Sequence, residues 1–238
     1  MQINQLSVVV PVRNESGNVA SLISEIDAAL KHMTHEIVYV DDGSTDDTYR
    51  QLKALQATFS QLKIVRHAQS CGQSTAVRTG VKAAQYDWVA TLDGDGQNDP
   101  ADISRLMAAV RDDIDMVGGN RRASRRDTWI KRISSVIANT VRSKMLRDDT
   151  PDTGCGLKLF KRDAFLDLPY FDHMHRFLPA LIKRYGGKIV SVPVAHRNRE
   201  HGKSNYGTID RLLVGIVDLF GVAWLQRRAK IPNIVTED

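Results

Sequence analysis

Cysteine is scarce in this sequence of 238 residues, which contains only Cys71 and Cys155. The two lie far apart and form no C-x-x-C pattern, so we expect free thiols in a reducing compartment rather than a disulfide. Long apolar runs are missing too. No stretch reaches the roughly 18 uncharged apolar residues of a membrane-spanning helix. The first residues have neither a basic stretch nor a long apolar core, so we expect no signal peptide.

Two common nucleotide-binding signatures are also absent. The first predicted strand, at 6–10, is followed by a segment with a lone glycine, Gly17, instead of G-x-G-x-x-G, which argues against an NAD-type Rossmann enzyme. The sequence contains no G-x-x-x-x-G-K-[ST], which argues against a P-loop NTPase. Aromatic residues make up 6% and do not alternate with basic ones, which disfavours a stacking platform for single-stranded nucleic acid.

The first half of the sequence does contain a regular alternation of strand and helix patterns. Short β-branched or apolar runs predict strands at 6–10, 36–40, 63–65, 88–92 and 115–119. Apolar residues at helical spacing predict helices at 16–33, 46–58, 73–84 and 100–111. This order predicts an α/β fold, with a parallel sheet covered by helices on both faces. After Asn120 we expect helices at 128–146, 174–185 and 209–225, and strands within 152–160 and at 188–194.

An acidic segment, Asp93-Gly94-Asp95-Gly96, directly follows the predicted strand at 88–92. Residues two apart in an extended backbone point the same way, so the two carboxylates would repel each other without a cation between them. Gly94 removes side-chain bulk and allows a close approach. Carboxylate oxygens suit Mg²⁺ or Mn²⁺ shared with a substrate phosphate. The alternative is an acidic turn before a helix, with Asp99 as its N-cap.

Two further polar loops, Val12–Glu15 and Asp41–Ser44, follow strands of the same predicted sheet. Ligands of such sheets bind beyond the carboxyl ends of the strands, so all three loops should meet there. Glu15, Asp41 and Asp42 can accept hydrogen bonds from a base or a ribose. Together with a metal-held diphosphate, they predict a nucleoside diphosphate site. Taken alone, each loop also fits an ordinary strand-to-helix connection.

The motifs Pro11-Val12-Arg13-Asn14-Glu15, Asp41-Asp42-Gly43-Ser44 and Asp93–Pro100 resemble, in this order, those of family 2 inverting glycosyltransferases with the GT-A fold. The segments 153–160, 175–178 and 192–206 are similar to those of the polyprenyl-phosphate glycosyltransferases, of the dolichol-phosphate mannose synthase type. The sequence departs from the family at Arg13, where Tyr or Phe is frequent, and at Gly94, where Ala is commoner.

The resemblance implies a mostly parallel GT-A (Rossmann-like) catalytic domain at 1–206. Its nucleotide-sugar half would be 1–119 and its acceptor half 120–206, and an amphipathic membrane-proximal helix and tail would occupy 207–238. The implied reaction moves a sugar from a GDP- or UDP-linked donor to a polyprenyl phosphate. That phosphate is already ionised at neutral pH, so it needs cationic positioning and no general base. The sugar, the base and the lipid length stay open.

The resemblance also assigns roles to residues. Mg²⁺ or Mn²⁺ would be held by Asp93, Asp95 and Gln97, and would neutralise the leaving diphosphate. Asp93, Asp95, Arg121 and Arg199 would be catalytic. The substrate-binding residues would be Pro11, Val12, Asn14, Glu15, Asp41, Asp42, Gln69, Gly94, Gln97, Arg132, Ser135 and Lys203. The other basic residues of 121–147, such as Arg125 and Arg142, are interpreted as solvated surface charges.

The segment 207–225 has apolar residues at helical spacing and is followed by Arg227 and Arg228. We expect it to lie in the membrane interface on the cytoplasmic face, by itself or through a small membrane partner. The alternative is packing on the core or on a second subunit.

Two other functions remain under consideration. A transferase for a soluble or glycan acceptor would need a carboxylate base, for which Asp152 is the candidate. A nucleic-acid-binding protein would use the basic stretch, but the acidic edge argues against that partner.

Overall fold

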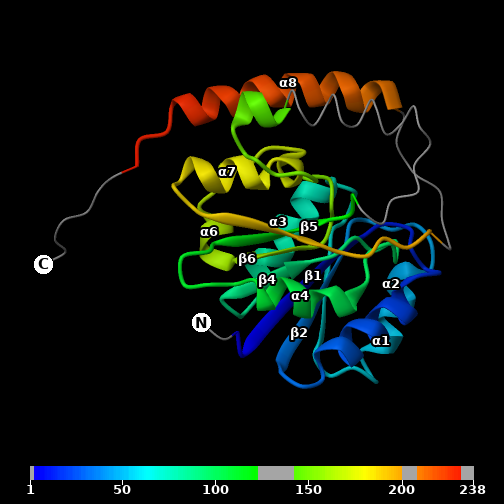
Figure 1. Ribbon diagram of the computed structural model, residues 1–238. Coiled ribbons are helices and arrows are strands. Elements are labelled where there is room, and N and C mark those ends of the chain that lie inside the picture. The colour runs from blue at the N-terminus through cyan, green and yellow to red at the C-terminus, as the bar shows by residue number, and fades with distance from the viewer. Residues whose placement is uncertain (1–2, 123–141, 200–207, 232–238) are drawn as a thin grey trace, which may run out of the picture.

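A seven-stranded sheet forms the centre of the computed structural model, which describes residues 3–122, 142–199 and 208–231 (Figure 1). The strands are β1 (Gln5–Val12), β2 (Thr34–Asp41), β3 (Leu62–Arg66), β4 (Trp88–Thr91), β5 (Met116–Asn120), β6 (Lys158–Lys161) and β7 (Ile189–Pro193). The helices are α1 (Val19–Leu30), α2 (Thr48–Leu55), α3 (Gln73–Ala83), α4 (Ile103–Ala108), α6 (Arg162–Leu166), α7 (Leu178–Arg184) and α8 (Thr208–Arg227), with short 3₁₀ helices η1 (Pro100–Asp102) and η2 (Met174–Arg176).

The strand order is β3-β2-β1-β4-β6-β5-β7, and six of the seven strands point the same way. β1 is parallel to β2 and β4, β2 is parallel to β3, and β5 is parallel to β7. β6 runs antiparallel to both β4 and β5 and separates them. The prediction of a mostly parallel sheet is confirmed, and β6 is its one antiparallel strand among the described residues. β6 lies far along the chain from both neighbours, so no local pattern indicates where it inserts.

Helices cover both faces of the sheet, as predicted. α1, α2 and α4 pack on one face, and α3, α6, α7 and α8 pack on the other. The side chains of β1 divide between the two layers: Val8 and Val10 belong to the first core cluster and Val9 to the second. This alternation follows from the period of two in an extended strand.

The predicted helix starts are confirmed in part. Asp99 caps η1 by accepting a hydrogen bond from the amide of Ala101 at 3.0 Å, and Pro100 occupies the first position. The helix predicted at 16–33 begins later than expected, since α1 starts at Val19.

The predicted helix at 128–146 lies outside the described residues except at 142–146, which are helical. Arg142 was expected to be a solvated surface charge, and this is wrong. Its side chain is buried, donates a hydrogen bond to the carbonyl of Thr150 at 2.7 Å and pairs with Asp148. The chain after the helix folds back over the guanidinium, which the local sequence pattern does not indicate.

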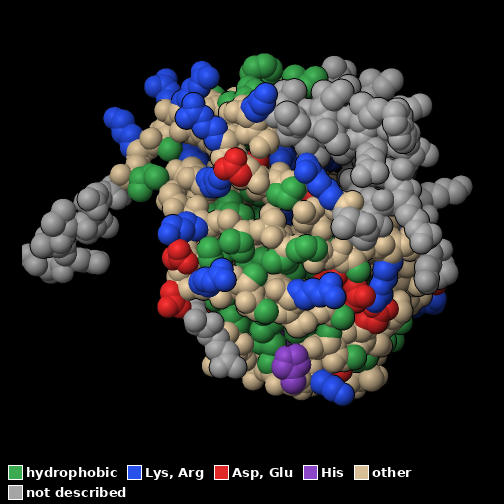
Figure 2. All heavy atoms as spheres, viewed as in Figure 1, with side chains coloured by type: hydrophobic (Ala, Val, Ile, Leu, Met, Phe, Trp, Pro, Cys, Tyr) green, Lys and Arg blue, Asp and Glu red, His purple; other side chains and the backbone are tan. Residues whose placement is uncertain are grey.

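α8 lies against α7 (Figure 1). The two sides of α8 differ in exposure. Val222 and Ala223 are buried against the second core cluster, whereas Val217, Phe220 and Trp224 are exposed. Figure 2 shows hydrophobic side chains along this edge of the molecule, and Lys and Arg side chains near the C-terminal end of α8. Among the described residues, no helix is long and apolar enough to cross a bilayer.

Candidate active site

The three polar loops meet at one edge of the sheet because the strands that precede them are parallel neighbours. In the register, Val12 at the end of β1 lies opposite Asp41 at the end of β2. The amide of Asp42 donates to the carbonyl of Val12 at 2.9 Å, and the amide of Leu92 donates to Val9 at 3.2 Å. β5 and β7 end at this edge as well, so the segments that carry Arg121 and Arg199 also start there.

The acidic loop after β4 is held by its own side chains. The amide of Asp93 donates to Asn98 Oδ1 at 3.2 Å, and the amide of Gln97 donates to Asp95 Oδ1 at 3.1 Å. Gly94 lies so close to Val12 that a Cβ there would collide with it, and the Cβ would also crowd the carbonyl of Pro11. Pro11 and Val12 thus form the wall behind the acidic loop.

Asp93 lies in the more enclosed part of the site. Its Oδ1 accepts a hydrogen bond from Gln73 Nε2 at 2.8 Å, and Gly156 leaves the space that its carboxylate occupies. Burial, followed by the nearby charge of Asp95, raises the pKa of Asp93, although Lys158 and Arg121 act in the opposite direction. The negative charge of Asp95 thus disfavours ionisation of Asp93.

Arg199 reaches across from the segment after β7 to these carboxylates. Its Nη2 lies 2.6 Å from Asp95 Oδ2 and 3.9 Å from Glu15 Oε1. Burial, opposed in part by a hydrogen bond from Asn18, raises the pKa of Glu15. The positively charged side chain of Arg199 is thus placed between two of the three predicted loops.

Arg121 is buried beneath the same edge, where it forms a two-pronged ion pair. Its Nε and Nη2 donate to the two carboxylate oxygens of Asp152 at 2.9 and 3.0 Å. Lys158, at the start of β6, is buried nearby and donates to the carbonyl of Cys155. Burial lowers the pKa of Lys158, while Cys155 and Asp93 favour its charged form.

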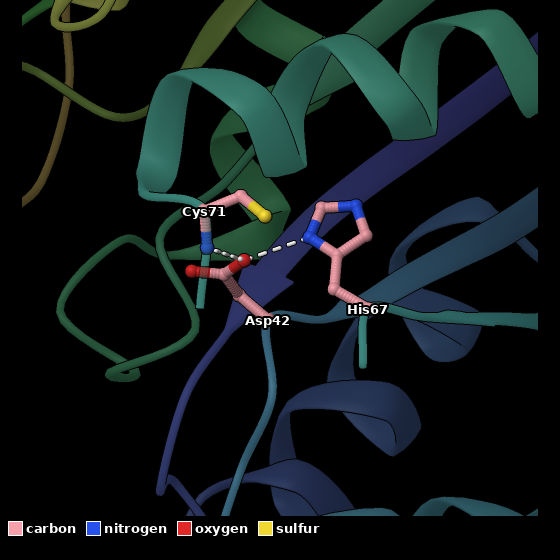
Figure 3. Close-up of side chains that lie close together, drawn as sticks. All are labelled: Asp42, His67 and Cys71. Carbon is pink, nitrogen blue, oxygen red and sulfur yellow. Dashed lines mark hydrogen bonds and ion pairs between the residues drawn. The ribbon is translucent and has the colours of Figure 1, made fainter. Parts of the chain in front are cut away.

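Asp42 is the most heavily hydrogen-bonded residue of the predicted donor site. Its Oδ1 lies 2.7 Å from His67 Nδ1 and accepts from the amide of Cys71 at 2.8 Å (Figure 3). Its Oδ2 accepts from Ser70 Oγ at 2.8 Å and from the amide of Gly72 at 3.0 Å. Burial alone would raise the pKa of Asp42, but these hydrogen bonds outweigh it and lower the pKa.

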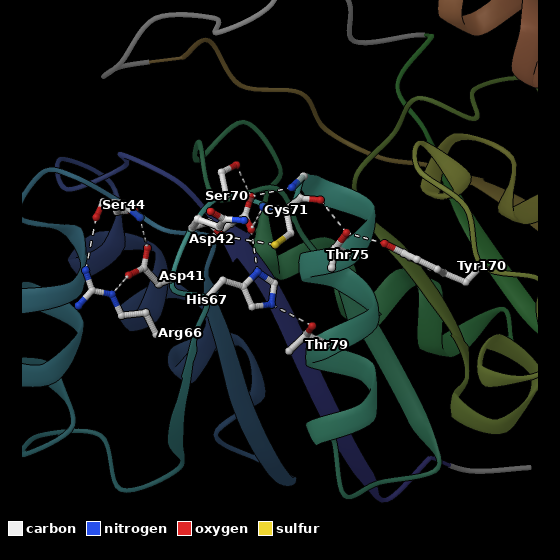
Figure 4. Close-up of polar contacts among 12 residues, drawn as sticks. Asp41, Asp42, Ser44, Arg66, His67, Ser70, Cys71, Thr75, Thr79 and Tyr170 are labelled. Carbon is white, nitrogen blue, oxygen red and sulfur yellow. Dashed lines mark hydrogen bonds and ion pairs between the residues drawn. The ribbon is translucent and has the colours of Figure 1, made fainter.

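The network around Asp42 extends to both sides of the turn (Figure 4). Asp41 is fully buried, accepts from the amide of Ser44 at 2.9 Å and pairs with Arg66 Nε at 3.0 Å. Gly43 adopts a φ of +68° and lies against the backbone of Gln69, so a side chain there would be strained and would collide. The turn and the loop at 67–72 therefore form one packed unit.

The remaining predicted residues occupy different parts of the structure. Asn14 Oδ1 accepts from the amide of Thr45 at 2.8 Å and links the first two loops. Gln69 is exposed beside Asp42. The side-chain amide of Gln97 donates to the carbonyl of Arg197 at 3.4 Å, and its role as a metal ligand stays a prediction. Other predicted residues lie outside the described part of the chain: Arg132, Ser135 and Lys203.

Several residues of the site were not selected from the sequence. Gln73 contacts Asp93 from the start of α3, and His67 contacts Asp42 from the end of β3. The sequence contains no short pattern that joins these pairs. Lys158 and Lys161 stand at the two ends of β6, and the sequence does not indicate that Lys158 is the buried one.

The two predicted free thiols agree with the structure, where Cys71 and Cys155 form no disulfide. His175 lies with its Nδ1 2.7 Å from Ser74 Oγ, and burial lowers the pKa of this histidine well below the ordinary value.

The chemistry of Asp93 and Asp95 fits a hard divalent ion. Both offer carboxylate oxygens, and their mutual repulsion would be relieved by a cation. Asp95 already attracts the guanidinium of Arg199 in the structure. These two residues are therefore the ones that could hold Mg²⁺ or Mn²⁺.

Comparisons of the sequence with known proteins identify its family. The family model described as Glycosyl transferase family 2 matches residues 7–168. Dodecaprenyl-phosphate galacturonate synthase of Rhizobium johnstonii is 34% identical over 96% of this chain and 69% of its own length. Undecaprenyl-phosphate 4-deoxy-4-formamido-L-arabinose transferase of Edwardsiella ictaluri is 34% identical over 85% of this chain and 63% of its own length. The chain thus spans about two thirds of the length of these relatives.

The fold is also similar to that of solved structures. Glucosyl-3-phosphoglycerate synthase from Mycobacterium tuberculosis, in complex with Mn²⁺, uridine diphosphate and phosphoglyceric acid, superposes with a TM-score of 0.69. The match covers 97% of this chain and 80% of that chain at 22% identity. At this identity the likeness shows a shared fold.

Proposed function

This chain belongs to glycosyl transferase family 2, and we propose that it transfers a sugar from a nucleoside diphosphate donor to a polyprenyl phosphate. The observation that carries the proposal is the meeting of Asp93, Asp95 and Arg199 at the carboxyl edge of the sheet. Anionic groups there can share a cation with a diphosphate, and a cationic group faces them. The relatives' names, both sugar transferases or synthases for polyprenyl phosphates, support this acceptor class.

The donor site is proposed to extend from the acidic loop to the loops after β1 and β2. Mg²⁺ or Mn²⁺ held by Asp93 and Asp95 would supply charge neutralisation for the leaving diphosphate. The solved neighbour contains Mn²⁺ and uridine diphosphate, which supports the same donor class here. Arg199 would exchange its contact with Asp95 for the diphosphate oxygens, since a guanidinium binds phosphate with two parallel hydrogen bonds.

The acceptor is proposed to enter on the side of Arg121, with Arg132 and Ser135 as predicted phosphate contacts. A phosphate monoester is ionised at neutral pH and attacks without a general base. Asp152, the candidate base for a glycan acceptor, instead accepts two hydrogen bonds from the guanidinium of Arg121 and a third from its backbone amide. This engagement favours the phosphate acceptor over the glycan alternative.

A lipid acceptor requires access to a membrane, and α8 supports that access. Its outer side exposes Val217, Phe220 and Trp224, and Arg227 and Arg228 follow at its end. Aromatic side chains with adjacent arginines suit the headgroup region of an anionic leaflet. We propose that α8 attaches the protein peripherally to the cytoplasmic face of a membrane.

The decisive experiment measures nucleoside diphosphate release by the purified protein. UDP- and GDP-linked sugars are supplied with Mg²⁺ or Mn²⁺, with and without undecaprenyl phosphate in detergent. We expect release only when metal and lipid phosphate are both present. Asp95→Asn should reduce it about 100-fold or more, the scale of losing one electrostatic stabiliser. Asp113→Asn, whose exposed carboxylate pairs with Lys188, is the matched control and should be unaffected.

Two outcomes would contradict the proposal. If Asp95→Asn retains full turnover, Asp95 does not hold a metal ion that the reaction needs. Release driven by a soluble glycan and lost in Asp152→Asn would support the glycan alternative. A thermal-shift series over nucleotide sugars would identify the donor, because a bound ligand raises the apparent stability.

A further inference from the structure

Asp42, His67 and Cys71 form a compact cluster at the same edge of the sheet as the candidate active site (Figure 3). They come from three segments: the residue after β2, the residue after β3 and the loop before α3. One oxygen, nitrogen or sulfur atom from each lies within 4.8 Å of the others. Within the described ranges, no other group of three His, Cys, Asp or Glu side chains meets this criterion.

We propose that this cluster binds a thiophilic divalent ion of the zinc class, at a site separate from the hard-ion site of Asp93 and Asp95. The donor set is one thiolate, one imidazole and one carboxylate, which selects Zn²⁺ over Mg²⁺. The two anionic ligands balance the charge of the ion. Three protein ligands would leave one position of a tetrahedral ion for a water molecule, and Cys71 is exposed to solvent.

The hydrogen bonds around the cluster orient the ligands. His67 Nδ1 faces Asp42 Oδ1 at 2.7 Å, and its Nε2 lies 3.0 Å from Thr79 Oγ1. If an ion is bound to Nδ1, the ring proton is on Nε2, and this N–H donates a hydrogen bond to the hydroxyl of Thr79. Histidines that bind metals usually donate their other N–H in this way. Asp42 Oδ2 keeps its hydrogen bonds from Ser70 and Gly72, which hold the carboxylate in place.

The binding step balances without any redox change. Bonds form from the ion to sulfur, nitrogen and oxygen, and the proton of the Cys71 thiol leaves to solvent. The imidazole proton moves from Nδ1 to Nε2 when the histidine is neutral, or one more proton leaves when it is charged. Zinc affinity therefore falls as the pH is lowered.

The site has a consequence for the donor, and this part rests on the proposed function. Asp42 and Gln69 are predicted to contact the nucleotide base. An ion on Asp42 takes an oxygen that the base would need and draws the loop at 67–72 toward the ion. Zinc and the nucleotide are thus expected to oppose each other at this loop.

The test measures zinc binding directly, with Zn²⁺ competing against a chromophoric chelator and without nucleotide or lipid. We expect one Zn²⁺ per chain. Cys71→Ser and His67→Gln should each weaken binding about tenfold or more. His32→Gln, which replaces an exposed histidine elsewhere, and Asp95→Asn should leave the affinity unchanged. No binding by the wild type, or equal affinity in Cys71→Ser and His67→Gln, overturns the site.

A second measurement needs no variant. Alkylation of exposed Cys71 by iodoacetamide, followed by mass spectrometry, should be slowed by Zn²⁺ and not by Mg²⁺. An equal rate with both ions contradicts the site. Co²⁺ should produce a thiolate charge-transfer band that Cys71→Ser removes.

The link between the zinc site and the donor is tested with UDP, which should weaken zinc binding. A zinc affinity unaffected by UDP overturns this link while the metal site stands. Failure of the transferase assay leaves the zinc measurements valid, so the two proposals are separable.

Discussion

At the scale of single residues, the ionisation of the acidic pair depends on the burial of Asp93 and on the nearby charge of Asp95. The pKa of Asp93 is raised mainly by burial and then by Asp95. A carboxyl group with a raised pKa is more stable in its protonated form, so its ionisation destabilises the folded state. The protonated form of Asp93 therefore favours the folded state. Its contribution to stability is fully present below the pKa that this carboxyl group has in the unfolded chain, and it is lost as the pH rises through the pKa in the folded state.

Asp93→Asn should therefore stabilise the metal-free protein at neutral pH. Each unit by which the pKa is raised corresponds to about 1.4 kcal/mol, or about 3–6 °C in Tm for a domain of this size. The same variant should lose the stabilisation by Mn²⁺ that the wild type gains. Melting in EDTA and in Mn²⁺ tests both effects. A lower Tm of the variant in EDTA would contradict the burial argument.

Metal binding by the wild type should weaken as the pH is lowered, because a protonated Asp93 is a poor ligand. Since the pKa of Asp93 is raised, this loss should begin at a higher pH than it would for two aspartates with ordinary pKa values. Mn²⁺ titrations followed by electron paramagnetic resonance between neutral pH and about pH 4.5 measure this. Constant affinity over the range would show that Asp93 is not a ligand.

Gly156 is the second residue on which the acidic pair depends. A Cβ at this position would overlap the carboxylate of Asp93. Gly156→Ala should displace Asp93, reduce turnover about tenfold or more and cost about 1–3 kcal/mol of stability, as overpacking does. Gly215→Ala in α8 is the control, since its Cβ meets open space. It should be neutral or stabilise by about 0.5–1 kcal/mol.

At the scale of elements, α8 combines two roles on opposite sides. Its inner side completes the core through Val222, and Gln226 Nε2 donates to the carbonyls of Leu146 and Ala180. Its outer side leaves Phe220 63% and Trp224 58% exposed, although both are large apolar side chains. In the part of α8 whose side chains the structure describes, packing on the core therefore leaves several large apolar residues exposed.

The double variant Phe220→Ser/Trp224→Ser should bind anionic phosphatidylglycerol vesicles at least about tenfold more weakly, because burying each such side chain contributes about 1.5–3 kcal/mol. Its Tm should change little. Val222→Ala is the opposite case and should lower the stability while vesicle binding persists. Flotation with vesicles and thermal melts separate the two. Unchanged flotation of the double variant would assign the outer side to another partner.

At the scale of the whole molecule, the segment after β7 contacts α1 and the acidic loop, which both belong to the first half of the chain. Arg197 pairs with Glu25 of α1 at 2.5 Å and with Asp99 at 2.9 Å, and its amide donates to the carbonyl of Gln97. Two residues later, Arg199 reaches Asp95 and Glu15. Arg197 is thus a positioning residue for the arginine of the site.

Arg197→Ala should reduce kcat/KM about tenfold, mainly through the KM for the nucleotide sugar, because Arg199 loses its anchored neighbour. The stability should fall by at most about 1 kcal/mol, since the ion pairs are partly exposed. Arg50→Ala removes an exposed pair with Asp47 and serves as the control. If both variants retain full activity, Arg199 is positioned without Arg197.

The order of elements in the first half followed from the sequence because the responsible patterns are local. β-branched runs, helical periodicity and the Asp99–Pro100 cap each involve neighbouring residues. The meeting of the three polar loops also followed, since parallel strands bring their carboxyl ends together. The pairing of Asp42 with His67 did not follow, because 25 residues separate them and no pattern links the two.

The sequence by itself thus determined the layered α/β architecture, the family and the acidic edge, all of which depend on periodicity and on residues close along the chain. Only the tertiary structure decided the antiparallel insertion of β6, the burial of Arg142 and Lys158, and the approach of Arg199 to Asp95. These features depend on packing and ion pairs between segments that are distant along the chain. Their outcome is set by the packing of the whole chain, which no short stretch of sequence contains.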